Sequence, residues 1–293
     1  MKVLTMVSPD GQELPGVLSP DGTRVFPLKN LGFDFPSLLH FIENASGDIL
    51  AALRRQLGGA GGGFPLSQVR LAAPIPHLRH DLLCLGLNYR EHVLESDLFM
   101  GSRETMPDCP VYFFKRVDRA VADGETIPAH GDVTAQLDYE AELAVVIGKR
   151  CDHIPREEVR GSIFGYTVVN DVTARDLQRA HGQYAFGKSL DGFTPMGPWI
   201  VTADELPYPP ALGVRSWVNG QLRQHGSTAD FLFDIDYVVS ELSSGIVLRP
   251  GDMISTGTPA GVGIGMKPPV FLKSGDTVRC EVEGVGAIEN KIE

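Results

Sequence analysis

Residues 138–148, DYEAELAVVIG, decide the fold class and the candidate chemistry of this chain. The stretch ends in consecutive apolar residues, which indicate a buried β-strand. Successive side chains of a strand point to opposite faces, so Glu140 and Glu142 share one face while Ala141 points to the other. Two neighbouring carboxylates repel each other unless a proton or a cation lies between them. The pattern predicts either a solvated strand end or part of a cation site, and both interpretations stay open here.

Short apolar runs separated by glycine and proline fill the chain beyond residue 70. Brief helical patterns at 90–97, 174–181 and 235–242 lie among them. This spacing predicts a mainly β domain of the α+β class over residues 71–293. The expected strands are 82–87, 111–114, 142–147, 163–169, 199–202, 214–218, 253–256 and 277–282.

A smaller unit is expected before this domain. Pro-Asp-Gly turns separate its strands, and two helical stretches follow them. The glycine-rich run 58–63 is the strongest change of composition in the chain and predicts a linker. We therefore expect a small N-terminal α+β domain at 1–70. Its expected elements are strands at 2–7, 13–18 and 23–28 and helices at 36–44 and 48–57.

The composition is that of an ordinary globular protein. The 293 residues carry 26 basic and 37 acidic side chains, which gives a net charge of −11, and 43% of the residues are hydrophobic. Nucleic acid and anionic membranes would require a clustered basic face, so we expect neither as a partner. An anionic substrate must then be held by local charges.

The sequence also bears on the compartment. The first apolar run ends at residue 7, shorter than the roughly 7–15 apolar residues in the core of a secretory leader, and no run approaches the roughly 18 that span a bilayer. The four cysteines are too far apart for a C-x-x-C site and too few for a disulfide scaffold. We expect a cytoplasmic protein with reduced thiols at Cys84, Cys109, Cys151 and Cys280.

A third carboxylate follows the next expected strand. Residues 165–171, GYTVVND, form an apolar run that ends at Asp171 and leads into a helical pattern. An aspartate at this place commonly caps the following helix. Three carboxylates that converge from two strands would instead form the oxygen shell that Mg²⁺ or Mn²⁺ prefers. Such a shell leaves positions open for water and substrate.

A candidate general base lies upstream, in residues 86–95, GLNYREHVLE. His92 and Glu95 are three residues apart, so on a helix they share a face and the carboxylate can orient the imidazole. A single His-x-x-Glu pair is more often a surface pair. It becomes a candidate base only if the fold places it beside the metal ligands.

Two further segments complete the set of motifs. Lys188, within the small and glycine-rich residues 186–192, is either a solvated lysine or one that reaches into a pocket. The segment 255–265, STGTPAGVGIG, lacks both the G-x-G-x-x-G pattern and the Gly-Lys-Ser/Thr ending of a phosphate loop, so we expect no nucleotide. It predicts a tight loop whose amides or Thr258 hydroxyl meet a ligand.

These motifs follow one another in order over roughly residues 75–293. They read Gly-Leu-Asn-Tyr-x-x-His92-x-x-Glu95, Asp-Tyr-Glu140-Ala-Glu142-Leu, Asn-Asp171-Val-Thr-Ala-Arg175-Asp-Leu-Gln178, Gly-Lys188-Ser and Gly-Thr258-Pro-x-Gly-Val-Gly. Together they resemble the fumarylacetoacetate hydrolase superfamily, and most closely its acylpyruvase-like bacterial-type members. The resemblance implies a catalytic domain of the mixed β-sandwich roll type, assembled as a homodimer.

The resemblance also assigns a role to each motif residue. The metal, Mg²⁺ or Mn²⁺, would be bound by carboxylates, the reaction would use a base dyad and a lysine, and further polar groups would bind the substrate. The implied metal ligands are Glu140, Glu142 and Asp171, the catalytic residues are His92, Glu95 and Lys188, and the substrate-binding residues are Arg175, Gln178 and Thr258.

The implied reaction acts on small 2-oxo acids. We expect a metal-dependent hydrolase that cleaves a C–C bond in an acylpyruvate or another 2,4-diketo acid, giving pyruvate and a carboxylic acid. An oxaloacetate-type decarboxylase and a 2-hydroxy-dienoate isomerase use the same enolate chemistry and remain alternatives. A catalytically silent binding protein is a third, since fold alone does not establish activity.

One polar segment and two arginines each allow two interpretations. Residues 96–109 are polar and contain Gly101 and Pro107, so they form either a lid over bound substrate or an exposed loop. Arg116 and Arg119 either select a distal carboxylate of the substrate or are solvated surface residues.

Overall fold

The computed structural model describes residues 1–8, 10–100 and 106–293. Within these ranges the strands are β1 (Lys2–Val7), β2 (Glu13–Leu18), β3 (Arg24–Pro27), β4 (Phe64–Pro65), β5 (Arg70–Leu71), β6 (Leu82–Leu85), β7 (Tyr112–Lys115), β8 (Thr126–Ile127), β9 (Leu137–Asp138), β10 (Ala141–Ile147), β11 (Ile163–Asn170), β12 (Thr173–Ala174), β13 (Met196–Thr202), β14 (Gly213–Val218), β15 (Gln221–Ser227), β16 (Met253–Ser255), β17 (Thr277–Val282) and β18 (Gly286–Ile292).

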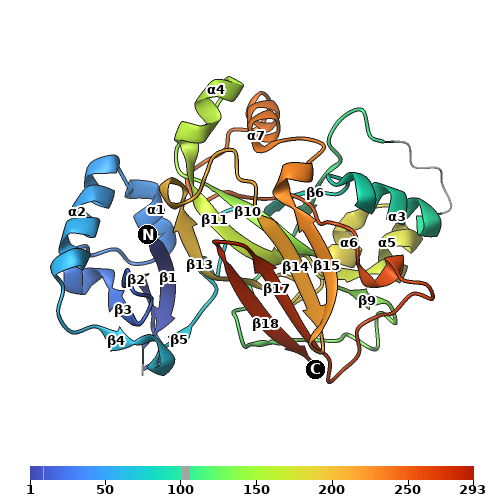
Figure 1. The fold of residues 1–293 in the computed structure, drawn as a ribbon, viewed down its shortest axis with the longest axis horizontal. Helices are drawn as coiled ribbons and strands as arrows, with labels where there is room; N and C mark the ends of the chain where they lie inside the picture. The colour runs from blue at the N-terminus through green and yellow to red at the C-terminus, as the bar shows by residue number, and fades with distance from the viewer. Residues whose placement is uncertain (9, 101–105) are drawn as a thin grey trace.

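Helices lie at both ends of the molecule and above the central strands in the view of Figure 1. The α-helices are α1 (Leu38–Asn44), α2 (Gly47–Gly59), α3 (Arg90–Met100), α4 (Arg156–Val159), α5 (Arg175–His181), α6 (Tyr184–Lys188) and α7 (Ile235–Ser243). The 3₁₀ helices are η1 (Leu28–Leu31), η2 (Leu66–Gln68), η3 (Arg160–Ser162), η4 (Ala203–Glu205), η5 (Thr228–Asp230) and η6 (Gly263–Gly265).

One long sheet runs through the described chain, in the order β4-β3-β2-β1-β13-β11-β10-β16-β6-β7, with β5 beside β1. Its N-terminal strands join the rest where β1 pairs with β13, with Lys2 opposite Val201. An apolar cluster continues across this junction and includes both Phe26 and Val146. Residues 1–70 therefore extend the sheet of the larger unit, and the domain boundary at residue 70 stays a prediction.

A second sheet, in the order β15-β14-β17-β18-β8, packs on one face of β10 and β11. The odd-numbered residues of β10, such as Val145, enter the cluster between the two sheets, while Ala144 and Val146 enter the cluster on the other face. Because β10 is buried on both faces, its residues 143–147 are continuously apolar rather than alternating. The predicted α+β, mainly β class with packed sheets is confirmed.

Helix positions follow the sequence patterns closely. The helices expected at 90–97, 174–181 and 235–242 are α3, α5 and α7. Helix α6 was not expected, because its five residues are too few to show a helical period. The four cysteines are free thiols, and no helix in the described ranges is long and apolar enough to cross a membrane.

Candidate active site

Two central strands of the long sheet bring three carboxylates together. In the antiparallel pair of β10 and β11, Glu142 lies opposite Val169, and the strand ends carry Glu140 and Asp171. One side-chain oxygen from each of Glu140, Glu142 and Asp171 lies within 4.8 Å of the others, and all three residues are at most 4% exposed. The convergence that the sequence left open is therefore present in the structure.

Three buried cations surround these carboxylates. The Lys188 Nζ atom donates to Glu140 Oε2 at 2.6 Å and to Asp171 Oδ2 at 2.7 Å. The Lys115 Nζ atom donates to Asp171 Oδ1 at 2.5 Å, and Arg175 Nη2 lies 2.7 Å from Glu140 Oε1. We call Lys115, Arg175 and Lys188 the cation cluster.

The cations affect the carboxylates unequally. Burial alone would raise the pKa of Glu140, but Lys188 and Arg175 outweigh it and lower that pKa to about 2. Burial raises the pKa of Glu142 well above its usual value, and the charges of Asp171 and Glu140 raise it further. Glu142 is therefore the carboxylate whose charge the protein compensates least.

Glu142 also provides the test of whether a divalent metal fits. Its Oε2 atom accepts from Ser255 Oγ at 2.6 Å and from the Gly257 amide at 2.9 Å. Its Oε1 atom is buried without a hydrogen-bond partner among the residues that the structure describes. A buried oxygen that lacks a partner needs a positive group to bind it. Together with the other two carboxylates it offers the oxygen ligands that a hard cation prefers. The residues present therefore fit Mg²⁺ or Mn²⁺.

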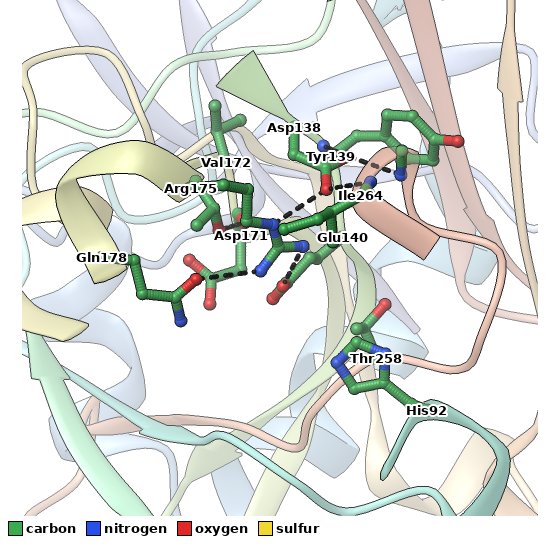
Figure 2. A network of polar contacts seen from close by, with 12 residues as sticks. His92, Asp138, Tyr139, Glu140, Asp171, Val172, Arg175, Gln178, Thr258 and Ile264 are labelled. Carbon is green, nitrogen blue, oxygen red and sulfur yellow. Dashed lines mark hydrogen bonds and ion pairs between the residues drawn. The ribbon is translucent and has the colours of Figure 1, made fainter. Parts of the chain in front are cut away.

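A fourth buried carboxylate, Asp138, belongs to the same network (Figure 2). Its Oδ2 atom accepts from Arg175 Nε at 2.8 Å, and its Oδ1 atom accepts from the Gly263 amide at 2.7 Å. With Glu140, Glu142 and Asp171 it forms what we call the carboxylate cluster. The three negative charges of Asp138, Glu140 and Asp171 balance the three cations, and a divalent cation bound with an ionised Glu142 would bring the total to about +1.

The predicted base dyad lies on α3. His92 Nδ1 is 3.4 Å from Glu95 Oε2, and His92 is 5% exposed. Both Glu95 oxygens accept from the Gly261 amide at 3.1 Å. The charge of His92 also lowers the pKa of Glu140, which places the imidazole near that carboxylate (Figure 2). The histidine is thus a buried group beside the carboxylates and not a surface residue.

The substrate-binding predictions divide into two kinds. Gln178 lies at the site, where its Oε1 atom accepts from Arg175 Nη1 at 3.3 Å. Thr258 is fully buried, and its hydroxyl donates to the Ala141 carbonyl at 3.0 Å and accepts from Gln224 Nε2 at 2.6 Å. The Thr258 hydroxyl thus fastens the glycine-rich loop to β10, and its role toward substrate stays a prediction.

The remaining candidates lie elsewhere. Arg116 is exposed, and Arg119 forms ion pairs with Glu125 and Glu13 outside the site. The solvated interpretation of these two arginines therefore fits the structure. The proposed lid at 96–109 includes residues 101–105, which lie outside the described ranges.

Sequence reasoning missed Lys115 and Asp138. Lys115 directly follows an apolar run and is completely buried, yet a lysine at the end of a strand ordinarily reaches solvent. Its position two residues after the buried Phe113, on the same face of β7, was the available signal. Asp138 lies two residues before Glu140 but ends β9, which pairs with β12 and not with the long sheet, so the alternation of β10 did not point to it.

Fold and site together define a class: a mainly β protein with an acidic cation centre and a His–Glu pair beside it. Comparison with known proteins specifies the family. The family model described as Fumarylacetoacetate (FAA) hydrolase C-terminal matches residues 81–293. The chain therefore belongs to the fumarylacetoacetate hydrolase family, a family of enzymes, as the motifs predicted.

Individual relatives cover several activities. The chain is 46% identical over 229 residues to oxaloacetate tautomerase YisK of Bacillus subtilis, across 78% of this chain and 75% of the relative. A fumarylacetoacetate hydrolase structure from Exiguobacterium antarcticum is 37% identical, with a TM-score of 0.81 and coverage of 100% and 99%. Maleylpyruvate hydrolase from Sphingobium sp. SYK-6, solved with manganese(II) and pyruvate, is 27% identical, with a TM-score of 0.80 and coverage of 100% and 98%.

Proposed function

We propose that this protein is a divalent-metal-dependent hydrolase that cleaves a C–C bond in an acylpyruvate or related 2,4-diketo acid, giving pyruvate and a carboxylic acid. The observation that carries the proposal is the Oε1 atom of Glu142, which has no hydrogen-bond partner in the part of the chain that the structure describes and is buried beside two other carboxylates and near a His–Glu pair. The manganese and pyruvate in the structure of the related maleylpyruvate hydrolase support it.

The metal, Mg²⁺ or Mn²⁺, would be held by Glu140, Glu142 and Asp171. When bound, it supplies a Lewis acid that polarises the 2-oxo acid and stabilises negative charge as the neighbouring carbon bond breaks. The protein's own cations serve the same purpose. Lys188 and Arg175 keep their positive charges, because their carboxylate partners raise both pKa values despite burial.

The dyad supplies the proton transfers. His92 accepts a proton from water, and Glu95 holds the imidazole with its basic nitrogen toward the site. The hydroxide adds to the distal carbonyl carbon, and Arg175 and Lys188 stabilise the resulting oxyanion. The C–C bond then breaks, its electron pair forms the enolate of pyruvate, and the proton held by His92 is transferred to the enolate carbon. One water is consumed and one carboxylic acid is released.

A second candidate acts on oxaloacetate. It is favoured by the 46% identity to a named oxaloacetate tautomerase. Tautomerisation moves a proton between carbon and oxygen through an enolate, and decarboxylation reaches the enolate of pyruvate by loss of CO₂. Neither reaction needs a water nucleophile, so the carboxylate and cation clusters would serve all three reactions.

The test is a substrate panel with and without EDTA. Purified protein is assayed with acylpyruvates, fumarylpyruvate and oxaloacetate in the presence of Mg²⁺ or Mn²⁺. We expect hydrolysis of a 2,4-diketo acid that EDTA abolishes. Turnover of oxaloacetate alone would favour the second candidate. If no substrate were turned over, the protein would be a catalytically silent binding protein.

The His92→Ala variant separates the reaction types. We expect hydrolysis to fall by about 10²–10⁴-fold, because the water loses its general base. Decarboxylation of oxaloacetate should persist, since it needs no activated water. Hydrolysis at the wild-type rate in this variant would show that His92 is not the base. The proposed homodimer is checked separately by light scattering of the same preparation.

A further inference from the structure

Asp138 lies between Arg175 and the loop that ends in η6, and it has no role in the proposed reaction so far. Both of its oxygens are fully committed: Oδ1 accepts from the amides of Gly263 and Tyr139, at 2.7 and 2.9 Å. The Oδ2 atom accepts from Arg175 Nε at 2.8 Å and from the Ile264 amide at 3.0 Å. One buried carboxylate thus joins a catalytic arginine to the loop that ends in η6 (Figure 2).

The same loop holds the base dyad. The Gly261 amide donates to both oxygens of Glu95, and helix α3 packs against η6. A Cβ atom on Gly265 would lie 1.8 Å from Glu95 Oε1, so the glutamate occupies the space that this glycine leaves. The Tyr139 hydroxyl donates to the Gly261 carbonyl at 2.9 Å, which ties the loop to the residue next to Asp138.

We propose that Asp138 is a positioning residue that couples the two halves of the active site. Through Oδ2 it orients the guanidinium of Arg175, and through the amides of Gly263 and Ile264 it fixes the loop that places Glu95 against His92. The inference rests on the proposed function for its catalytic consequence. Its structural content, a link from Asp138 to Gly261 and Glu95, does not depend on which 2-oxo acid is the substrate.

The charge of Asp138 matters because all four of its partners are donors. In Asp138→Asn, one oxygen becomes an NH₂ group of almost the same size. Whichever way the amide turns, two donors lose their acceptor, either Arg175 Nε with the Ile264 amide or the amides of Gly263 and Tyr139. The variant therefore disturbs the orientation of one half of the site while it keeps the volume of the side chain.

The kinetic test compares Asp138→Asn with Asp176→Asn. Asp176 follows Arg175 in the same helix but accepts from Thr134 Oγ1 at 2.6 Å and from the Ala135 amide at 2.9 Å, outside the site. We expect Asp138→Asn to lower kcat by about 10²-fold, with KM changed by less than about threefold, because the amide misplaces either the oxyanion donor Arg175 or the loop that holds the dyad. Asp176→Asn should keep kcat and KM while it lowers Tm.

The coupling is tested in a second background. Because Asp138 acts in part through the dyad loop, its substitution should lower kcat by clearly less than about 10²-fold once Glu95→Gln has already removed the dyad carboxylate, and the remaining effect is that on Arg175. Effects that multiply in full would overturn the proposal. So would an Asp138→Asn protein that loses only Tm and keeps its kcat per folded molecule.

A readout without substrate separates this proposal from the proposed function. Amide hydrogen exchange of Gly261 should be faster in Asp138→Asn than in wild type, although Asp138 does not bond that amide, and unchanged in Asp176→Asn. Unchanged protection of Gly261 in Asp138→Asn would refute the coupling. If Gly261 responds but the wild-type protein turns over no 2-oxo acid, the coupling stands and the proposed function falls.

Discussion

The carboxylate cluster and the base dyad form two halves of one site, yet the fold holds them differently. Glu142 projects from the ladder of two central strands, and Glu140 and Asp171 flank that ladder, with ion pairs of 2.5–2.7 Å around the last two. The dyad lies on helix α3, with a separation of 3.4 Å between His92 and Glu95 and one backbone amide that fixes the glutamate. The two central strands thus place the three carboxylates, and a helix together with the Gly261 loop positions the groups that move protons.

The first prediction concerns the carboxylate cluster, which the central strands hold. In Glu142→Gln the pocket keeps its shape but loses a negative ligand. We expect kcat to fall by at least about 10³-fold, because Lewis-acid stabilisation is worth several kcal/mol and each 1.36 kcal/mol is tenfold in rate. Calorimetric titration with Mn²⁺ should show the matching loss of affinity.

Glu289→Gln is the control for that variant. Glu289 is an exposed residue of β18, and its change should leave both the Mn²⁺ affinity and kcat at wild-type values. Wild-type Mn²⁺ affinity in Glu142→Gln would show that the metal lies elsewhere.

This contrast also explains what the sequence was able to predict. The spacing of Glu140 and Glu142 places both on one face of a strand whatever lies around it, so the carboxylates followed from alternation alone. The approach of Asp171 depended on the pairing of β10 with β11, which connects residues far apart in the chain. Sequence patterns named the residue, and the sheet register decided its neighbours.

The dyad and the cation cluster were harder for the same reason. The link of Glu95 to Gly261 joins a helix to a loop 166 residues later, and no local pattern encodes such a contact. Lys115 reads as an ordinary strand-end lysine until Asp171 is placed beside it. The sequence also did not predict that the strands of residues 1–70 join the long sheet, because the pattern of a hairpin does not show which other strand its free edge will pair with.

The second prediction concerns a substitution that disturbs only the base dyad, which the Gly261 loop holds in place. A Cβ at residue 265 would meet Glu95, whose flexible side chain can move away, so Gly265→Ala should fold with little change in Tm. We expect hydrolysis to fall by up to about 10²-fold in kcat, because a displacement of about 1 Å in a catalytic group has that cost. The Mn²⁺ affinity should not change.

Gly245→Ala serves as its control, because a Cβ there meets nothing within 4 Å. This variant should match wild type in kcat, Tm and Mn²⁺ affinity. If Gly265→Ala weakened Mn²⁺ binding as much as hydrolysis, the carboxylate cluster and the dyad would not be separable.

The third prediction removes one member of the cation cluster. Lys115 is fully buried against Asp171, and Lys115→Met replaces it with an uncharged side chain of similar length. The charge of the metal-loaded site falls from about +1 to about 0, so an anionic substrate should bind less well, with KM raised by about tenfold. Because a repelling charge has gone, the Mn²⁺ affinity should stay the same or increase.

The sign of the metal effect makes this prediction specific. Loss of a buried partner leaves Asp171 with Lys188 alone, so the metal-free variant should unfold more easily, by about 3–5 kcal/mol. Added Mn²⁺ should recover part of that stability, because the metal restores positive charge beside the same carboxylate. A Lys115→Met protein that binds Mn²⁺ more weakly, while its KM is unchanged, would mean that Lys115 orders the metal ligands rather than balancing the charge of the substrate.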